Sequence, residues 1–361
     1  MSSLEEVAKE AGLPFGMAAA SQVKALSAAY NQGEATPHSL AARLAFFFAR
    51  DVPKAEAAVR ELVLTKTLEL SSARPLRVLD LGAGLGAATW GVARALRDRS
   101  GRIEATLVDR DRSALDLAMS IAKRRRHEEG ALTLGIETVV ADVMEVEPRG
   151  ADLVIAENVL AEISGSIDED ADRLERWLRL VREDGSLVII EPALRGLSRH
   201  LHEVRDRLAS RKRTIFAPCL HERSCPALAK PNDWCHEDLP VNLPEPLVAV
   251  ARAAGLRWQG LTFSYLILRR DEKTLASHVP GGSFRVVSSL IRTKGKREAH
   301  LCGKTSSGKA MRLDRDASAK NRAFDHVERG DLIDIDPAPE EKTRFRIGDG
   351  ACVIDVGPKR H

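Results

Sequence analysis

Three glycines in the stretch VLDLGAGLGAATW, namely Gly82, Gly84 and Gly86, have the spacing of a nucleotide-binding turn. They follow a short apolar segment and precede a run with helical spacing. Glycine tolerates positive φ and lets a ligand approach backbone that a Cβ atom would shield. Taken as Gly82, Gly84 and Ala87, the same letters also satisfy the dinucleotide fingerprint, so the turn alone does not identify the ligand. It predicts a strand–turn–helix site for a nucleotide-type ligand.

Three acidic residues near predicted strand ends narrow the choice of ligand. Asp80 stands two residues before the first glycine, where a carboxylate suits the ammonium of a methionine moiety. Asp109 ends the second predicted strand and is placed to bind ribose hydroxyls, and Asp142 follows the third strand, within reach of an adenine edge. This constellation resembles the S-adenosylmethionine-dependent methyltransferases of the Rossmann-like class, and the resemblance implies S-adenosylmethionine as cofactor. The alternative is a turn kept for packing, with the acids capping helices.

The residue that would assist methyl transfer is less clearly marked. Glu157 and Asn158 end the fourth predicted strand, in AENVLAEI, at the mouth of the sheet. That segment contains neither an Asn/Asp-Pro-Pro-aromatic motif nor a Pro-Cys nucleophile. Glu157 is therefore a candidate base or a residue that lines the cofactor cleft. The second role is favoured, because no partner His or Lys is identifiable from spacing.

Three cysteines, Cys219, Cys225 and Cys235, fall within seventeen residues of a proline-rich segment. Free cysteines are often small buried apolar residues, but the prolines here disfavour a regular helix or strand. The cysteine count is odd, at five, and no secretory signal is visible, so a metal site is favoured over a disulfide scaffold. His221 and His236 add nitrogen donors for zinc. Four thiolates would equally suit an iron–sulfur cluster.

A doubly wound α/β domain is the element that must position these residues. Apolar strand candidates alternate with helical segments from Arg77 onward, which implies a parallel sheet covered on both faces. We expect residues 71–270 to form this domain, with the cysteine-rich loop 214–240 inside it. The strand candidates are RVLDL, EATLVD, IETVVAD, ADLVIAEN, SLVIIEP and a segment near Leu261–Leu268, and the helices are Ala87–Leu96, Ser113–Arg126, Ala171–Val181 and Leu247–Ala254.

The regions on either side of this domain differ from it in pattern. Residues 1–70 read as helical, with a helix over His38–Leu62 interrupted at Pro53, and no chemistry is evident there. Short β-branched segments separated by Gly, Lys and Asp predict a small basic β domain over 282–361. Within it, Cys352 alternates with apolar residues and is expected to be a core residue.

Composition excludes several classes of protein. The chain has 361 residues, of which 44% are hydrophobic and 30% charged, so it can bury a core and is not a disordered polymer. No apolar stretch reaches the length of a membrane span, and no targeting peptide is visible, so we expect a soluble cytoplasmic protein without a membrane partner.

The net charge is only +3, but residues 285–329 contain twelve Lys or Arg against five Asp or Glu, and residues 195–213 seven against two. Both stretches could meet a polyanion, although a solvated surface is the alternative.

With these pieces assembled, the chain resembles the methyltransferase-like family associated with the mitochondrial small ribosomal subunit and its bacterial relatives. The matching pieces are VLDLGAGLGAATW, LVIIEP, APCLHERSCP, NDWCHE and the late HLC. The resemblance covers about residues 35–305 and implies a [4Fe–4S] cluster on Cys219, Cys225, Cys235 and Cys302. It departs from the family in the residues after LVIIEP, which read ALRG instead of a Gly-Thr-Pro-like turn, and in Glu237, where the family usually has Phe.

Three functional hypotheses follow from the residues and the resemblance. The first is a methyltransferase acting on ribosomal RNA of the small subunit. The second is a small-subunit assembly factor that retains the fold and performs no methyl transfer. The third is a protein or small-molecule methyltransferase with a structural metal site. The basic stretches favour the first over the third, and the absence of an identifiable base keeps the second close to the first.

Overall fold

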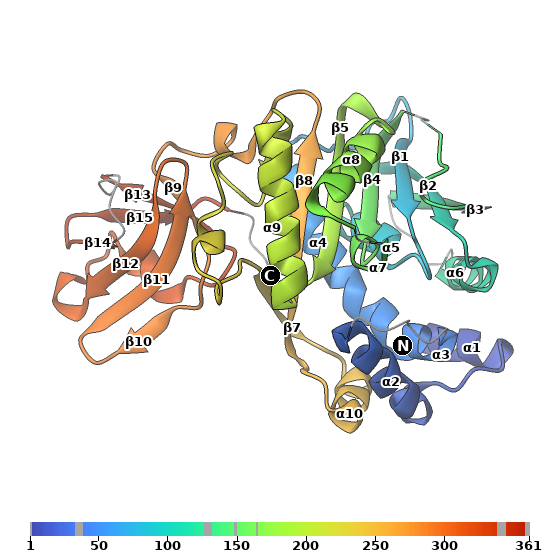
Figure 1. Ribbon diagram of the computed structural model, residues 1–361. Coiled ribbons are helices and arrows are strands. Elements are labelled where there is room, and N and C mark those ends of the chain that lie inside the picture. Colours follow the sequence, from blue (N-terminus) through green and yellow to red (C-terminus); the bar gives the residue numbers. More distant parts are fainter. Residues whose placement is uncertain are drawn as a thin grey trace.

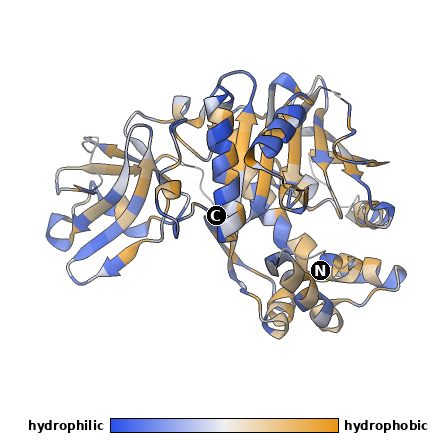
Figure 2. Ribbon diagram, in the orientation of Figure 1, coloured by the Kyte–Doolittle hydropathy of each residue, from blue (hydrophilic) through white to orange (hydrophobic). Residues whose placement is uncertain are grey.

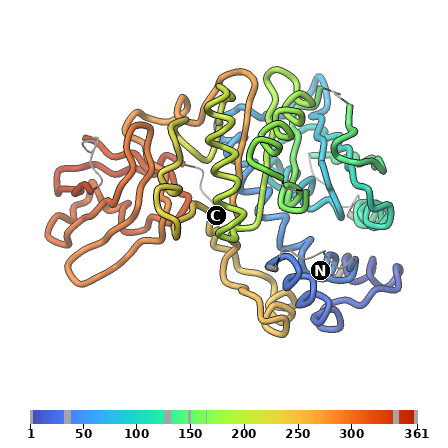
Figure 3. Tube along the Cα trace, viewed as in Figure 1, coloured from blue at the N-terminus to red at the C-terminus, as the bar shows by residue number. Residues whose placement is uncertain are grey.

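The chain forms two β-sheets and the helices that cover them, as the computed structural model shows (Figure 1). The structure describes residues 2–32, 39–125, 132–147, 150–163, 165–337 and 344–357. The tube in Figure 3 shows that the last part of the chain, orange to red, forms the smaller sheet at one end of the molecule. Within the described ranges, no helix is both long and apolar enough to cross a membrane.

The larger sheet contains both parallel and antiparallel strands, whereas the sequence predicts a parallel sheet. Over the described residues it has eight strands, of which five run parallel in the order β3, β2, β1, β4, β5. β8 pairs antiparallel with β5, and β6 and β7 both pair antiparallel with β8. The direction of winding reverses between β1 and β4, which is where open α/β sheets bind ligands. The strands are β1 (Leu76–Leu81), β2 (Gly101–Asp109), β3 (Leu132–Val140), β4 (Ala151–Glu157), β5 (Val181–Pro192), β6 (Thr214–Ala217), β7 (Glu237–Asn242) and β8 (Gln259–Arg269).

Helices cover both faces of this sheet because its central strands are apolar on both sides. In β5, Val188 packs with α4 and α5, whereas its neighbours Leu187 and Ile189 pack with α8 and α9. Figure 2 shows the strands as hydrophobic and the visible faces of α8 and α9 as largely hydrophilic. The helices that cover the sheet are α4 (Phe48–Leu64), α5 (Ala87–Ala95), α6 (Arg112–Arg125), α7 (Leu160–Ile163), α8 (Ile167–Leu178) and α9 (Arg195–Ser210).

A separate helical layer, which we call the N-terminal layer, closes over the carboxyl edge of the sheet. Phe46 and Leu26 of this layer are fully buried against Val250 of α10, and Leu4 and Leu44 pack with Ile121 of α6. The layer consists of α1 (Ser2–Glu10), α2 (Ala20–Gln32), α3 (Leu40–Ala42), a π-helical turn (Arg43–Phe47) and the start of α4, together with α10 (Glu245–Ala254).

The predicted interruption at Pro53 is wrong, because α4 runs through this proline without a break. Pro53 lies in the second turn of the helix, where a missing N–H costs a single backbone hydrogen bond. The buried side chains along α4, among them Val59 and Leu62, outweigh that loss. The irregular part is the π-helical turn just before α4. Two residues assigned to predicted helices, His38 and Arg126, lie outside the described residues.

The smaller sheet has a core of its own. Its described strands follow the order β14, β12, β11, β9, β13, β15, with β10 added beside β11, and only β12 and β14 run parallel. Phe284, Phe324 and Ile333 are buried between them. Cys352 is only partly buried, since Val353 is the β15 residue that faces the core, so its prediction as a core residue is wrong by one position. The strands are β9 (Ser283–Val286), β10 (Ile291–Thr293), β11 (Lys296–Gly303), β12 (Ser307–Leu313), β13 (Leu332–Asp336), β14 (Arg344–Arg346) and β15 (Cys352–Asp355).

A buried ion pair joins the smaller sheet to helix α4, which packs on the larger sheet. Arg285 of β9 donates from Nη1 to Glu61 Oε1 at 2.8 Å and from Nη2 to Glu61 Oε2 at 3.0 Å. Tyr265 of β8 donates to the same carboxylate at 3.0 Å. Arg285 also donates to the carbonyl oxygens of Pro218 and Gly330. One guanidinium therefore connects α4, the cysteine-rich segment and the smaller sheet.

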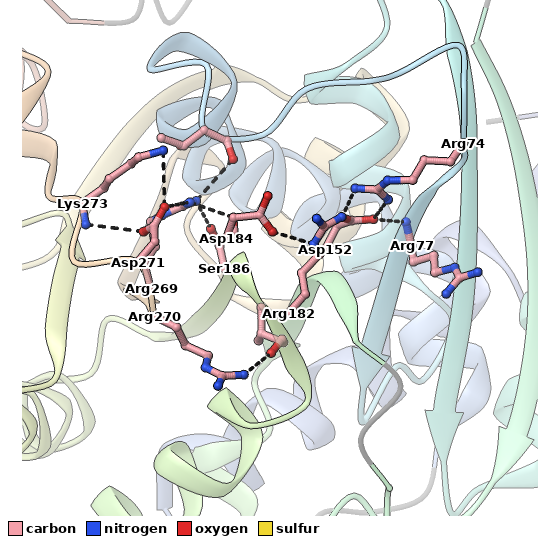
Figure 4. Close-up of polar contacts among 12 residues, drawn as sticks. Arg74, Arg77, Asp152, Arg182, Asp184, Ser186, Arg269, Arg270, Asp271 and Lys273 are labelled. Atoms are coloured by element: carbon pink, nitrogen blue, oxygen red, sulfur yellow. Dashed lines mark hydrogen bonds and ion pairs between the residues drawn. The ribbon is translucent and has the colours of Figure 1, made fainter.

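A second polar network fastens the amino edge of the larger sheet (Figure 4). Asp152 accepts hydrogen bonds from Arg74 and Arg182, and these bonds hold its pKa below the usual range although burial opposes them. Arg269 pairs with Asp271 through two hydrogen bonds, which lower the pKa of that carboxyl to about 2. These charges lie at the edge opposite the glycine turn, so they stabilise the sheet without taking part in a site there.

Candidate functional site

The glycine turn adopts backbone conformations that favour glycine. Gly82, Gly84 and Gly86 have φ angles of 63°, 51° and 82°, in the left-handed region. A Cβ on Gly82 would lie 2.5 Å from a methyl group of Val159, whereas a Cβ on Gly84 would meet only Arg43 Nη1, at 4.0 Å. Gly82 is thus required by packing, and Gly84 leaves space that a ligand can occupy.

The turn opens into a cleft of about 690 Å³ at the carboxyl edge of the sheet. Gly86 does not line this cleft, because a Cβ there would point at Leu107, 3.0 Å away. The remaining residues predicted to bind the cofactor lie far apart in the sequence but border this one cavity: Asp80, Gly82, Gly84, Asp109, Asp142 and Glu157.

Two of the three strand-end aspartates organise backbone around the cleft. Asp109 accepts from the backbone N–H of Gly84 at 2.8 Å and so holds the glycine turn against the end of β2. Asp142 accepts from the backbone N–H of Met144 at 2.8 Å and shapes the loop after β3. Both side chains lie where a nucleoside bound along the turn would pass.

Asp80 is turned toward the start of α5. It is 1% exposed, and its Oδ2 accepts from the backbone N–H and the hydroxyl of Thr89, at 3.1 and 2.7 Å. Burial raises its pKa to about 7, and the two hydrogen bonds oppose that rise. The predicted direct bond from Asp80 to a ligand ammonium therefore competes with an existing helix-capping interaction.

Glu157 differs from the other acids of the cleft. Both carboxylate oxygens are shielded from solvent, and neither has a hydrogen-bond partner in the part of the chain that the structure describes. Burial, followed by the nearby charge of Asp51, raises its pKa well above the ordinary value. The next residue, Asn158, has a φ of 61° and donates to Asp51 Oδ2 at 3.5 Å. Asp51 in turn forms a 2.6 Å ion pair with Lys54.

Sequence reasoning missed the contribution of the N-terminal layer, for which it expected no chemistry. Tyr30, Arg43, Arg50, Asp51 and Lys54 all line the cleft. Arg50 lies over the Phe46 ring, and Tyr30 donates to Glu162 of α7 at 3.1 Å. Polar residues within an otherwise apolar helical pattern, such as Asp51 and Lys54, were the available signal.

The four cysteines predicted to bind metal border a second cavity, of about 480 Å³, which we call the cysteine cavity: Cys219, Cys225, Cys235 and Cys302. The first three come from the segment between β6 and β7, and Cys302 comes from β11 of the smaller sheet. His221 Nε2 lies 3.3 Å from Cys302 Sγ. The cavity is therefore built from both sheets.

The thiols are close enough to influence one another. Burial and, after it, the neighbouring Cys219 raise the pKa of Cys225 to about 11 and that of Cys302 to about 12. Burial likewise raises the pKa of Cys235 well above its ordinary value. Across the described ranges, however, no group of three or more His, Cys, Asp or Glu side chains is arranged to hold a metal ion. The predicted metal-binding loop thus has the donors in one cavity without a preformed coordination shell.

Of the two basic stretches, one is largely neutralised within the protein. Arg207, Arg211 and Arg213, in and just after α9, pair with acidic residues of α8. The other stretch includes the hairpin that joins β10 and β11, where Lys294 is exposed while Lys296 and Arg297 pair with Glu298 and Asp314. The hairpin is the better candidate for a surface that meets a polyanion.

Comparisons with known proteins add the following. A family model described as the mitochondrial small ribosomal subunit protein Rsm22 matches residues 42–326. No curated protein matches the chain.

Methyltransferases are among the solved structures to which the chain is similar. One, described as a sarcosine dimethylglycine methyltransferase from Galdieria sulphuraria, has 12% identity and a TM-score of 0.37, covering 61% of this chain and 86% of its own. The plantazolicin methyltransferase BpumL, in complex with SAH, has 9% identity and a TM-score of 0.37, covering 74% and 98%. A class I S-adenosylmethionine-dependent methyltransferase from Listeria monocytogenes has 17% identity and a TM-score of 0.36, covering 69% and 68%.

Proposed function

The chain belongs to the family of the mitochondrial small ribosomal subunit protein Rsm22, and from this premise we propose that it is an S-adenosylmethionine-dependent methyltransferase of small-subunit ribosomal RNA. The observation that carries the proposal is the convergence of Gly84, Asp109, Asp142 and Glu157 on one cleft at the reversal point of the sheet. Those residues suit a nucleoside that carries a cationic group better than a small metabolite without a base.

The chain's own residues have separate tasks in this proposal. Gly84 leaves room for the ligand to lie against the turn, and Asp109 keeps the turn in place while presenting its free lone pairs to ribose hydroxyls. Asp142 lies beside the adenine end of the cleft. Bound S-adenosylmethionine would supply the methyl group. In such a transfer the methyl group would pass to a substrate atom, the electron pair of the carbon–sulfur bond would stay on sulfur, and the substrate's proton would leave to a base or to water.

A test of the cofactor site compares two glycine-to-valine variants that strain the backbone alike. Gly84→Val places a branched side chain in the cleft. Gly150 has a similar φ, 62°, and open surroundings outside the cleft, so Gly150→Val strains the backbone without filling the cleft. Calorimetric titration with S-adenosylhomocysteine should show binding to the wild type and to Gly150→Val, and loss of at least tenfold in affinity for Gly84→Val. Equal affinities in all three proteins would remove the turn from the site.

Transfer itself is tested with radiolabelled S-adenosylmethionine and immature small ribosomal subunits. Incorporation of label into RNA, lost in Gly84→Val, is the expected result. The second hypothesis, a non-catalytic assembly factor, is favoured by one observation, namely that Glu157 has no donor or relay partner among the described residues. Cofactor binding without any incorporation of label would establish that alternative.

We also propose that the cysteine cavity holds a [4Fe–4S] cluster. In support, four thiols from two sheets border one cavity, and thiolates are the ligands such clusters use. A cluster also needs no mononuclear shell, because each thiolate binds a different iron atom. Cys219, Cys225, Cys235 and Cys302 would hold it, and when bound it would supply a structural link between the larger and smaller sheets. Zinc, the alternative, requires its ligands around one ion, an arrangement absent from the described residues.

A further inference from the structure

The base of the cleft beside Glu157 contains more negative charge than positive charge. The charged groups that act most strongly on Glu157 are Asp51 and Lys54 of α4, Asp80 of β1 and Glu191 of β5. Lys54 is the single cation among them, and it is already paired with Asp51 at 2.6 Å. With all of these groups ionised, three carboxylates would remain without a cation.

Glu157 is the carboxylate of this group that accepts no hydrogen bond from the described residues. Asp80 accepts two hydrogen bonds from Thr89 of α5. Glu191 accepts hydrogen bonds from the backbone N–H groups of Leu160 and Ala161, at 2.9 and 3.1 Å. The two carboxylate oxygens of Glu157 accept no hydrogen bond from the described residues, and they are also shielded from solvent. A buried carboxylate without donors or a cation is unfavourable unless it is protonated or a positive charge comes close.

The arginines that line the cleft, Arg43, Arg50, Arg110 and Arg257, donate no hydrogen bond to Glu157. Arg43 and Arg50 belong to the N-terminal layer. Arg50 lies over the Phe46 ring, with 5.5 Å between the guanidinium carbon and the ring centre. A cationic ligand in the cleft would supply a positive charge beside the two carboxylate oxygens of Glu157, which have no partner among the described residues.

We propose that Glu157 makes the cleft selective for the sulfonium cofactor S-adenosylmethionine over its neutral thioether product S-adenosylhomocysteine. This inference rests on the proposed function. The two molecules differ by one methyl group and one positive charge, so a pocket that reads only shape separates them poorly. An uncompensated carboxylate beside the cleft attracts the charged molecule and releases the product, whose sulfur is neutral.

The selectivity depends on pH in a defined direction. Because burial raises the pKa of Glu157, its carboxyl is protonated in the empty cleft at low pH, and a sulfonium must displace that proton to bind. Affinity for S-adenosylmethionine therefore rises with pH, by up to about tenfold per unit for one proton released. Burial also raises the pKa of Asp80, to about 7, and that of Glu191, to about 8, and both carboxyls act on Glu157. The share that belongs to Glu157 is isolated by substitution.

The experiment measures calorimetric affinities of both ligands between about pH 5.5 and about pH 7, where their α-amino groups stay protonated. It uses the full-length wild type, Glu157→Gln, and the control Glu145→Gln, which removes one exposed carboxylate outside the cleft. In the wild type and the control, affinity for S-adenosylmethionine should rise with pH more steeply than affinity for S-adenosylhomocysteine. Glu157→Gln should lose at least tenfold in affinity for S-adenosylmethionine at the upper pH, with a shallower slope, and keep its affinity for S-adenosylhomocysteine.

The outcomes separate this inference from the proposed function. Identical pH profiles for the two ligands in the wild type, or an unchanged preference in Glu157→Gln, would overturn the role of Glu157 while leaving the cofactor site intact. Failure of the wild type to bind either ligand would overturn the proposed function instead. Retained binding of S-adenosylhomocysteine shows that Glu157→Gln is folded, and the wild-type pH profile needs no variant at all.

Discussion

Replacing Arg285 by methionine would leave Glu61 as a buried carboxylate without its cation. The two side chains are 4% and 2% exposed, and the guanidinium bonds both carboxylate oxygens. Breaking such a buried pair from one side costs about 3 to 5 kcal/mol, mostly because the remaining charge is left uncompensated. The carbonyl oxygens of Pro218 and Gly330 would lose a donor as well. The melting temperature should fall by about 6 to 20 °C if each kcal/mol corresponds to about 2 to 4 °C.

Two further variants distinguish a missing charge from lost packing. Tyr265→Phe removes a neutral donor to Glu61 and should cost about 1 kcal/mol. A double variant that replaces Arg285 by Met and Glu61 by Leu should recover most of the stability, since neither charge is then buried alone. Equilibrium unfolding in urea measures these differences, and limited proteolysis reports opening of residues 270–282 between the sheets. A loss below about 1 kcal/mol for Arg285→Met, without faster cleavage, would refute the idea that this pair holds the sheets together.

Two other predictions concern the metal and the RNA. Cys302→Ser should remove iron and sulfide from anaerobically purified protein, whereas Cys352→Ser, outside the cysteine cavity, should leave both in place. The opposite pattern would show that Cys352, and not Cys302, is the fourth ligand. Charge reversal of Lys294, Lys296 and Arg297 together should weaken binding to small-subunit ribosomal RNA and flatten its salt dependence, as measured by filter binding, while an unchanged slope would mark the hairpin as a solvated surface.

The glycine turn was predictable because local sequence determines its conformation. The strand–turn–helix around Gly82 and Gly84 follows from an apolar run, glycines and a helical pattern, and the structure places it as expected. The position of β-strand ends also follows from pattern, so Asp109 and Asp142 could be assigned to the same edge of the sheet. These features need no knowledge of how distant segments pack.

Features that depend on distant packing were not predictable from pattern. The antiparallel pairing of β6 and β7 with β8 is a choice among edges that a single sequence does not encode locally. The basic stretch 195–213, most of which forms α9, was predicted to meet a polyanion because of its charge. Arg207 and Arg211, however, pair with acidic residues of α8 that lie about forty residues away in sequence. Charge counted along the chain thus overstated the positive charge available to a polyanion.

Helix α4, which begins in the N-terminal layer, contributes residues both to the cleft and to the ion pair with the smaller sheet. Near its start, Asp51 and Lys54 line the cleft beside Glu157, and near its end Glu61 holds Arg285 next to the cysteine-rich segment. An α-helix rises 1.5 Å per residue, so the ten residues from Asp51 to Glu61 span about 15 Å of rigid backbone. Any shift of the smaller sheet that moves Arg285 therefore acts on the same helix that shapes the cleft. Helix α4 therefore lines the cleft and, through the ion pair of Glu61 with Arg285, is bonded to a residue that borders the cysteine cavity.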